Sequence, residues 1–319
     1  MKKYLCLLMI LFSALGWAAK PKWLSETGAY CGQQKLCAVG EGSGHLSAES
    51  NAMNALAKIF GTHVQSKLEI YNKSSSQTDE SGPLSGVDDE EVTATIKEKT
   101  DQLLVGVEVK EKYETPDGIF ALAVLNKIKG AKILKTQMQE IDEKIKGWFK
   151  DGRRASLNKI LKEFKIRGNL NLKHQVLTEK SYPSPITYRQ VIAKKAKKRA
   201  KKVVVFVDFK SFEKKSPLKH VFINALVDND YLVVVKKALP HQYIVKGELT
   251  TEKTYFNVKG FEKHHFHFKI VSEKLDGKKL GALNFSSEQI GRDQRQSFNK
   301  ASVEIKKYII ENLDELNID

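Results

Sequence analysis

The alternation of apolar and polar positions predicts a small strand-and-helix unit near the start of the chain. A short apolar strand at residues 37–39 is followed by a glycine-rich turn at residues 40–44 and then by apolar residues at helical spacing. These residues are Ala48, Ala52, Ala55, Leu56, Ile59 and Phe60, and Ser47 is expected to be the N-cap of their helix. Because several of them are small, this face of the helix can lie close against a sheet.

A β-hairpin is predicted after this helix. The chain first passes through a short expected strand at residues 68–71 and a polar, serine-rich loop at residues 74–89. Valines then alternate with polar or small residues from 105 to 109, a turn follows at 115–118, and residues 119–125 are all apolar. A strand that is apolar throughout is covered on both faces, so we expect this last segment to be the central strand of its sheet.

Two further patterns complete the chain. The helical period returns from residue 127 to 168, with a break near Asp151, which predicts an αα-hairpin. The second half opens with a β-branched strand at residues 203–209, and Ser216 and Pro217 then begin a helix. Further strands are expected at residues 231–235, 243–246, 266–271 and 280–285, the last two joined by a turn at 275–278, with a closing helix at residues 293–313.

These elements predict an α+β protein with two small α/β-sandwich-like domains joined by a helical hairpin and a basic linker. The expected parts are a signal peptide at residues 1–19, a first domain at 20–126, the helical hairpin at 127–180, the basic linker at 181–202 and a second domain at 203–319.

The first residues of the chain predict export. Lys2 and Lys3 precede an apolar run at residues 4–15, and small residues follow it, so cleavage is expected after Ala18 or Ala19. The run is shorter than the roughly 20 apolar residues of a helix that spans a bilayer. The mature protein is therefore expected in the periplasm, either free or associated with the outer membrane.

Residues 21–166 resemble the Lpp-twenty family of bacterial envelope lipoproteins. The resemblance rests on Trp23, the Ala38-Val39-Gly40 sequence and the alanine-rich helix that follows, and a similar unit forms the amino-terminal domain of flagellar assembly protein T. It implies a role in assembling the cell envelope. The chain departs from the lipoproteins because Cys6 lies inside the apolar run and no lipobox cysteine stands at the expected cleavage site.

The second domain resembles a different module. The order strand, helix, strands, helix, with residues 243–247 ahead of an Asp276-Gly277 hairpin, is similar to the anticodon-binding-like module of exported proteins. Proteins with such a module include the TolB amino-terminal domain, CsgG and LpoB. The resemblance implies an assembly or adaptor role and brings no catalytic residue with it.

Cys31 and Cys37 are the two cysteines that remain after the signal peptide is removed. An isolated pair in an oxidising compartment is expected to form a disulfide, here across a short hairpin. A redox or metal site is the alternative interpretation, with His45 as the one histidine near the two thiols in the sequence.

The net charge of the chain is +16, from 54 lysines and arginines against 38 acidic residues. An exported protein meets lipid head groups, lipopolysaccharide phosphates and acidic protein faces rather than nucleic acid, so no nucleic-acid partner is expected. The densest cations are Lys194, Lys195, Lys197, Lys198, Arg199, Lys201 and Lys202. Two interpretations stay open: a solvated basic helix or linker, or a contact with an anionic lipid or lipopolysaccharide surface.

Three histidines form the one cluster that suggests a metal. In a strand, His265 and His267 project from one face and His264 from the other, so at most two converge and a third ligand would have to come from elsewhere. Two imidazoles beside many lysines are more typical of a solvated sheet face. The sequence therefore predicts neither a metal site nor a cofactor.

No catalytic motif is visible in the sequence. The glycines at residues 40–44 lack the lysine of a phosphate-binding loop, and Asp89, Glu90 and Glu91 stand in a serine-rich segment where solvated acids are expected. We therefore expect an exported, non-enzymatic envelope assembly or adaptor protein whose partners are other envelope proteins. The alternative is a periplasmic hydrolase or metal-binding enzyme whose site is not visible in the sequence.

Overall fold

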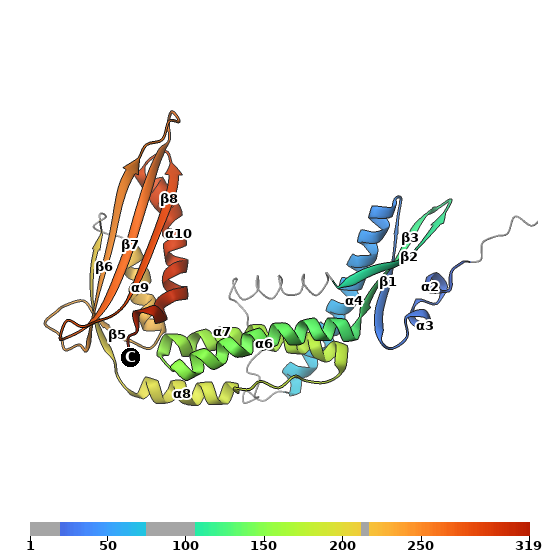
Figure 1. Cartoon of the computed structure of the whole chain (residues 1–319), viewed down its shortest axis with the longest axis horizontal. Helices are drawn as coiled ribbons and strands as arrows, with labels where there is room; N and C mark the ends of the chain where they lie inside the picture. Colours follow the sequence, from blue (N-terminus) through green and yellow to red (C-terminus); the bar gives the residue numbers. More distant parts are fainter. Residues whose placement is uncertain (1–19, 75–105, 212–216) are drawn as a thin grey trace, which may run out of the picture. The chain divides into compact units, whose positions relative to one another are not determined.

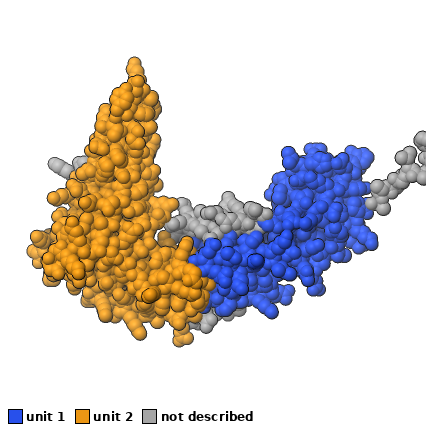
Figure 2. All heavy atoms as spheres, in the orientation of Figure 1, with its two compact units in different colours: residues 1–141, 165–184 blue, residues 142–164, 185–319 orange. Residues whose placement is uncertain are grey.

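The computed structural model describes residues 20–74, 106–211 and 217–319. The expected signal peptide, most of the serine-rich loop with its acidic residues, and Ser216 lie outside these residues. The protein belongs to the α+β class and divides into two compact units (Figure 2). Unit 1 comprises Met1–Ile141 and Lys165–Ser184, and unit 2 comprises Asp142–Phe164 and Pro185–Asp319.

Unit 1 is built on a three-stranded antiparallel sheet in the order β1-β3-β2 (Figure 1). Its strands are β1 (Lys35–Gly42), β2 (Val107–Thr115) and β3 (Gly118–Asn126). The predicted hairpin is confirmed, and so is the central position of the apolar strand. The long helix α4 (His45–Ser74) covers one face of the sheet, against which it buries every fourth residue of its first half: Ala48, Ala52, Leu56 and Phe60.

The opposite face of this sheet is covered by the indole of Trp23. This residue lies in the short helix α2 (Lys22–Ser25), which is followed by α3 (Thr27–Cys31), and it packs against Leu122 and Val124 of β3. Strand β3 is thus buried on both faces, as its unbroken apolar sequence predicts.

Small residues fill the contact between α4 and the sheet. Gly40 and Gly42 lie within strand β1, so the prediction of a turn there is wrong for these two residues. A Cβ atom on Gly40 would come within 2.0 Å of the backbone nitrogen of Ala52, and one on Gly42 within 2.5 Å of that of Ala48. The two glycines are therefore needed because the helix backbone approaches the strand directly.

Two other predictions for α4 are wrong. The helix begins at His45, and the Ser47 hydroxyl hydrogen-bonds back to the backbone of Gly44 instead of serving as the N-cap. Residues 68–71 continue the helix rather than forming a strand, because no glycine or proline interrupts residues 62–74 and several of these residues are good helix formers.

The αα-hairpin is confirmed, with α6 (Lys127–Asp151), a break at Gly152, and α7 (Arg154–Thr178), which extends ten residues beyond the predicted end. Gly152 has a φ of +70°, which favours glycine at this turn. Within the segment expected as a linker, α8 (Tyr188–Ala200) is a helix, and Thr187 and Gln190 form a capping box at its start.

Unit 2 contains a five-stranded sheet in the order β5-β4-β6-β7-β8. Its elements are β4 (Val204–Ser211), α9 (Pro217–Asp228), β5 (Leu232–Val234), β6 (Tyr243–Thr254), β7 (Glu262–Lys274), β8 (Lys279–Gly291), α10 (Gln294–Asn312) and the short 3-10 helix η1 (Leu313–Leu316). Strand β4 pairs in parallel with β5 and β6, and the other pairs are antiparallel.

One face of this sheet is buried and the other is largely open. Alternate residues such as Leu249, Phe266 and Phe268 pack with Phe298 and Ile305 of α10, so the side chains between them project from the opposite face. Strands β6 to β8 are 12 or 13 residues long, which is three times the predicted length for β6 and about twice the predicted length for β7 and β8. Their outer parts were missed because polar residues there obscure the apolar alternation.

Candidate functional site

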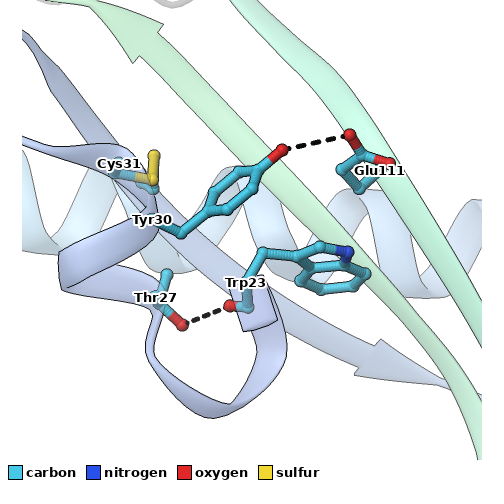
Figure 3. The surroundings of a disulfide bond; sticks show 6 residues. Trp23, Thr27, Tyr30, Cys31 and Glu111 are labelled. Atoms are coloured by element: carbon cyan, nitrogen blue, oxygen red, sulfur yellow. Dashed lines mark hydrogen bonds between the residues drawn. A yellow bond between two sulfur atoms is a disulfide. The ribbon is translucent and has the colours of Figure 1, made fainter. Parts of the chain in front are cut away.

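Unit 1 contains the expected disulfide, which joins Cys31 to Cys37 (Figure 3). The two Cα atoms are 6.3 Å apart. Because Cys31 ends helix α3 and Cys37 lies in strand β1, the two cysteines do not share the hairpin that the sequence had suggested. The neighbouring Tyr30 hydroxyl donates to the Glu111 carboxylate at 3.2 Å, and this bond raises the pKa of Tyr30. These links hold α2 and α3 over the sheet, with Trp23 beneath them (Figure 3).

Replacing both Cys31 and Cys37 with serine is expected to lower the free energy of unfolding by about 2 kcal/mol, because the closed loop is short. Urea unfolding of the oxidised parent and of the double variant measures this difference. Mass mapping without reductant provides the control. Two free thiols in protein taken from the periplasm would contradict the prediction.

Several cations of the basic cluster at residues 194–202 contact other residues of unit 2. The Lys194 ammonium stands over the Phe149 ring at 4.4 Å, Arg199 and Lys195 contact Asp230 at 3.1 and 3.7 Å, and Lys198 contacts Asp319 at 3.1 Å. Within the described chain, no ion pair joins the side chains of Lys197, Lys201 or Lys202. These three cations are therefore the part of the cluster that is open to an external anion.

A buried arginine at the start of α7 organises the same region. The Arg154 side chain is 1% exposed, and it donates to the Asp319 carboxylate at 2.7 Å and to the backbone carbonyls of Lys198 and Lys201. Its guanidinium also lies 5.4 Å from the centre of the Tyr231 ring. Burial raises the pKa of the Tyr231 hydroxyl, which donates to the carbonyl of Ile318. The sequence gives no sign that Arg154 is buried, because Arg154 stands beside Arg153 and close to Lys150, and all three would be expected to face solvent.

The loop between β6 and β7, residues 255–261, exposes apolar side chains at the upper tip of the sheet (Figure 1). Tyr255 is 88% exposed, Val258 48% and Phe261 45%. Just before the loop, Lys253 pairs with Glu262 at 2.6 Å, and this bond lowers the pKa of Glu262. Sequence reasoning did not single out this loop, although three aromatic residues within seven positions are a readable signal.

The predicted separation of the histidines is confirmed, and the structure adds a third ligand group. His264 is buried and contacts Glu262 at 3.0 Å, whereas His265 and His267 share the open face of the sheet. Glu252 of β6 lies directly across from His265, and its Oε1 atom is 3.5 Å from Nδ1 of His265 and 3.4 Å from Nε2 of His267. The sequence could not supply this partner because the register of β6 against β7 was unknown.

Among the described residues, none of the helices has the length together with the apolar character that crossing a bilayer requires.

Comparison with known proteins gives weak structural similarities. No protein-family model matches the chain, and no curated protein matches it. Among solved structures, the secreted protein HP1454 from Helicobacter pylori is similar with a TM-score of 0.39 and 12% identity, over 88% of this chain and 98% of that one. The rare lipoprotein B from Shewanella oneidensis has a TM-score of 0.23 and 12% identity, over 35% of this chain and 89% of that one. A minor lipoprotein from Acinetobacter baumannii has a TM-score of 0.23 and 13% identity, over 34% and 83%.

Proposed function

We propose that this chain is an exported, non-enzymatic protein that holds other components of the cell envelope in place through protein–protein contacts. The observation that carries the proposal is the apolar loop at residues 255–261. Exposed apolar residues are ordinary when they are scattered, but Tyr255, Val258 and Phe261 are gathered in a single loop. Aromatic side chains are also enriched in protein interfaces, so this loop has the composition of a contact surface.

A second feature supports a binding role. Strand β8 is 13 residues long and lies at the edge of the five-stranded sheet, where it pairs with β7 on one side. The backbone groups on the outer side of an edge strand can accept an added strand from a partner. Unit 2 thus combines an apolar loop with an edge suited to strand addition.

The location in the envelope is proposed from the sequence. The residues that predict a signal peptide lie at the start of the chain, and a disulfide such as Cys31–Cys37 persists in an oxidising compartment. Of the possible assemblies, a flagellar or outer-membrane complex is the one that the resemblance of residues 21–166 favours. The adaptor role would assign one partner to each unit.

Cross-linking in living cells tests this proposal. A photoreactive residue in place of Tyr255 is expected to capture an envelope protein, because a contact surface at the loop would bring the partner within reach. The matched control is Leu275, an apolar residue that is also exposed but lies at the opposite end of β7, in the turn before β8. The same reactive group there should capture much less.

The proposal fails if Tyr255 yields no specific adduct, or if both positions yield the same adducts. It also fails if the purified protein alone turns over a cell-wall or phosphate substrate, a result that would favour the enzyme alternative.

A further inference from the structure

We propose that Glu252, His265 and His267 form a binding site for a divalent transition-metal ion of the Zn²⁺ class. These residues offer two imidazole nitrogens and a carboxylate oxygen, and the ligand atoms all lie within 4.8 Å of one another. The site stands on the open face of the unit 2 sheet and shares no residue with the apolar loop at residues 255–261, on which the proposed function rests. Sequence reasoning favoured a solvated face here, and the position of Glu252 reverses that preference.

The strand register brings the three groups together without help from a loop. His265 and His267 are two residues apart on β7, so their side chains leave the same face, and their ring centroids are 4.1 Å apart. Glu252 pairs with His265 across the β6–β7 ladder. Because β7 is hydrogen-bonded to strands on both sides, the backbone beneath the site is fixed.

The distances suit a metal. In a tetrahedral site with metal–ligand bonds of roughly 2.0–2.1 Å, neighbouring ligand atoms are separated by about 3.3 Å. The Glu252 oxygen is already 3.5 Å from His265 Nδ1 and 3.4 Å from His267 Nε2. If the two imidazole rings moved slightly toward each other, their nitrogens and the Glu252 oxygen would occupy three corners of the tetrahedron. The fourth corner would be open to water.

The donor types select the class of ion. Imidazole nitrogens favour zinc, copper and nickel, whereas magnesium and calcium prefer sites made of oxygen ligands. Two lysines flank the histidines on the open face of β7: Lys263, which pairs with Glu288 at 2.5 Å, and Lys269, which lies two residues beyond His267. Glu288 also lies directly across from His265 on β8, which places a second carboxylate beside the site.

Isothermal titration of the mature protein with Zn²⁺, after chelator treatment and dialysis, tests the proposal. We expect saturable binding of one ion per chain. Each of Glu252→Gln, His265→Ala and His267→Ala should weaken the affinity at least about tenfold, because removing even a supporting residue of a metal site has effects of this size. Mg²⁺ should not compete at equal concentration.

The matched control is His45→Gln. His45 pairs with Glu114 at 3.1 Å on the surface of unit 1, so it forms a histidine–carboxylate pair outside the proposed cluster. This variant should bind Zn²⁺ as the parent does. Circular dichroism of each metal-free variant shows whether its fold is retained, so that a loss of binding can be assigned to the ligand.

Two results would overturn the assignment: Zn²⁺ binding that does not saturate, or saturable binding that survives all three substitutions. Neither result bears on the apolar loop, whose cross-linking is measured separately.

Discussion

Replacing Arg154 with alanine is expected to destabilise unit 2 by about 3–5 kcal/mol, the size of effect seen when one partner of a buried ion pair is removed. The guanidinium is almost completely buried, and it satisfies a carboxylate and two backbone carbonyls at once. Without the guanidinium, Lys198 would be the remaining ion-pair partner of Asp319 among the described residues. The substitution would also open a cavity beside Tyr231.

Urea unfolding of the parent and the variant measures this loss. Arg154→Lys should give an intermediate value, because an ammonium keeps the charge but cannot reproduce the planar fork of the guanidinium. The control is Arg189→Ala on α8, where the side chain is exposed and the cost should stay within about 0.5 kcal/mol. If Arg154→Ala cost no more than Arg189→Ala, the network around Arg154 would not stabilise the unit.

The second large effect is expected in unit 1, where Gly40→Ala should cost about 3 kcal/mol. The added Cβ would lie 2.0 Å from the nitrogen of Ala52 and 2.5 Å from the oxygen of Ala48, both backbone atoms of α4. A flexible side chain could move aside, but here the whole helix must shift from the sheet. That shift would also loosen the contacts of Leu56 and Phe60.

Gly44→Ala is the matched control, because a Cβ at Gly44 meets no atom within 4 Å. Its cost should be about 1 kcal/mol or less, as expected for a residue that only borders the helix. Chemical denaturation of both variants gives the comparison. Equal costs for the two substitutions would mean that the close approach of α4 to β1 does not require glycine.

The sequence was most informative where local pattern and tertiary environment agree. The apolar run at 119–125 could only be a covered strand, and the break at Asp151 and Gly152 divided two strongly periodic helices. At Asp293 the predicted start of the last helix is confirmed, because its carboxylate accepts a hydrogen bond from the Gln296 nitrogen at 2.7 Å.

The sequence was less informative where long-range contacts decide. Gly40 and Gly42 resemble a flexible turn until the path of α4 across β1 is known. Residues 250–254 resemble a loop because all five side chains are polar, although these residues belong to a long hairpin. In each case a partner distant in the chain sets the conformation, and local propensity is overridden.

The candidate sites follow the same rule. The disulfide could be predicted because both cysteines lie within six residues of each other. For the proposed metal site, the sequence predicted only that His265 and His267 share one face of a strand, because Glu252 depends on the strand register. Arg154 gave no signal, since its partner Asp319 lies 165 residues away.

The division of α6 and α7 between the two units sets an order of assembly. Unit 1 needs residues 165–184 before it is complete, and by then residues 142–164 have already emerged during synthesis. This middle segment belongs to unit 2 and includes Arg154, whose partners Lys198, Tyr231 and Asp319 are made later. Domains usually fold one after another from the amino terminus. Here the second unit begins before the first is finished, so Arg154 lacks its carbonyl acceptors until Lys201 has been made and its carboxylate partner until Asp319 has been made.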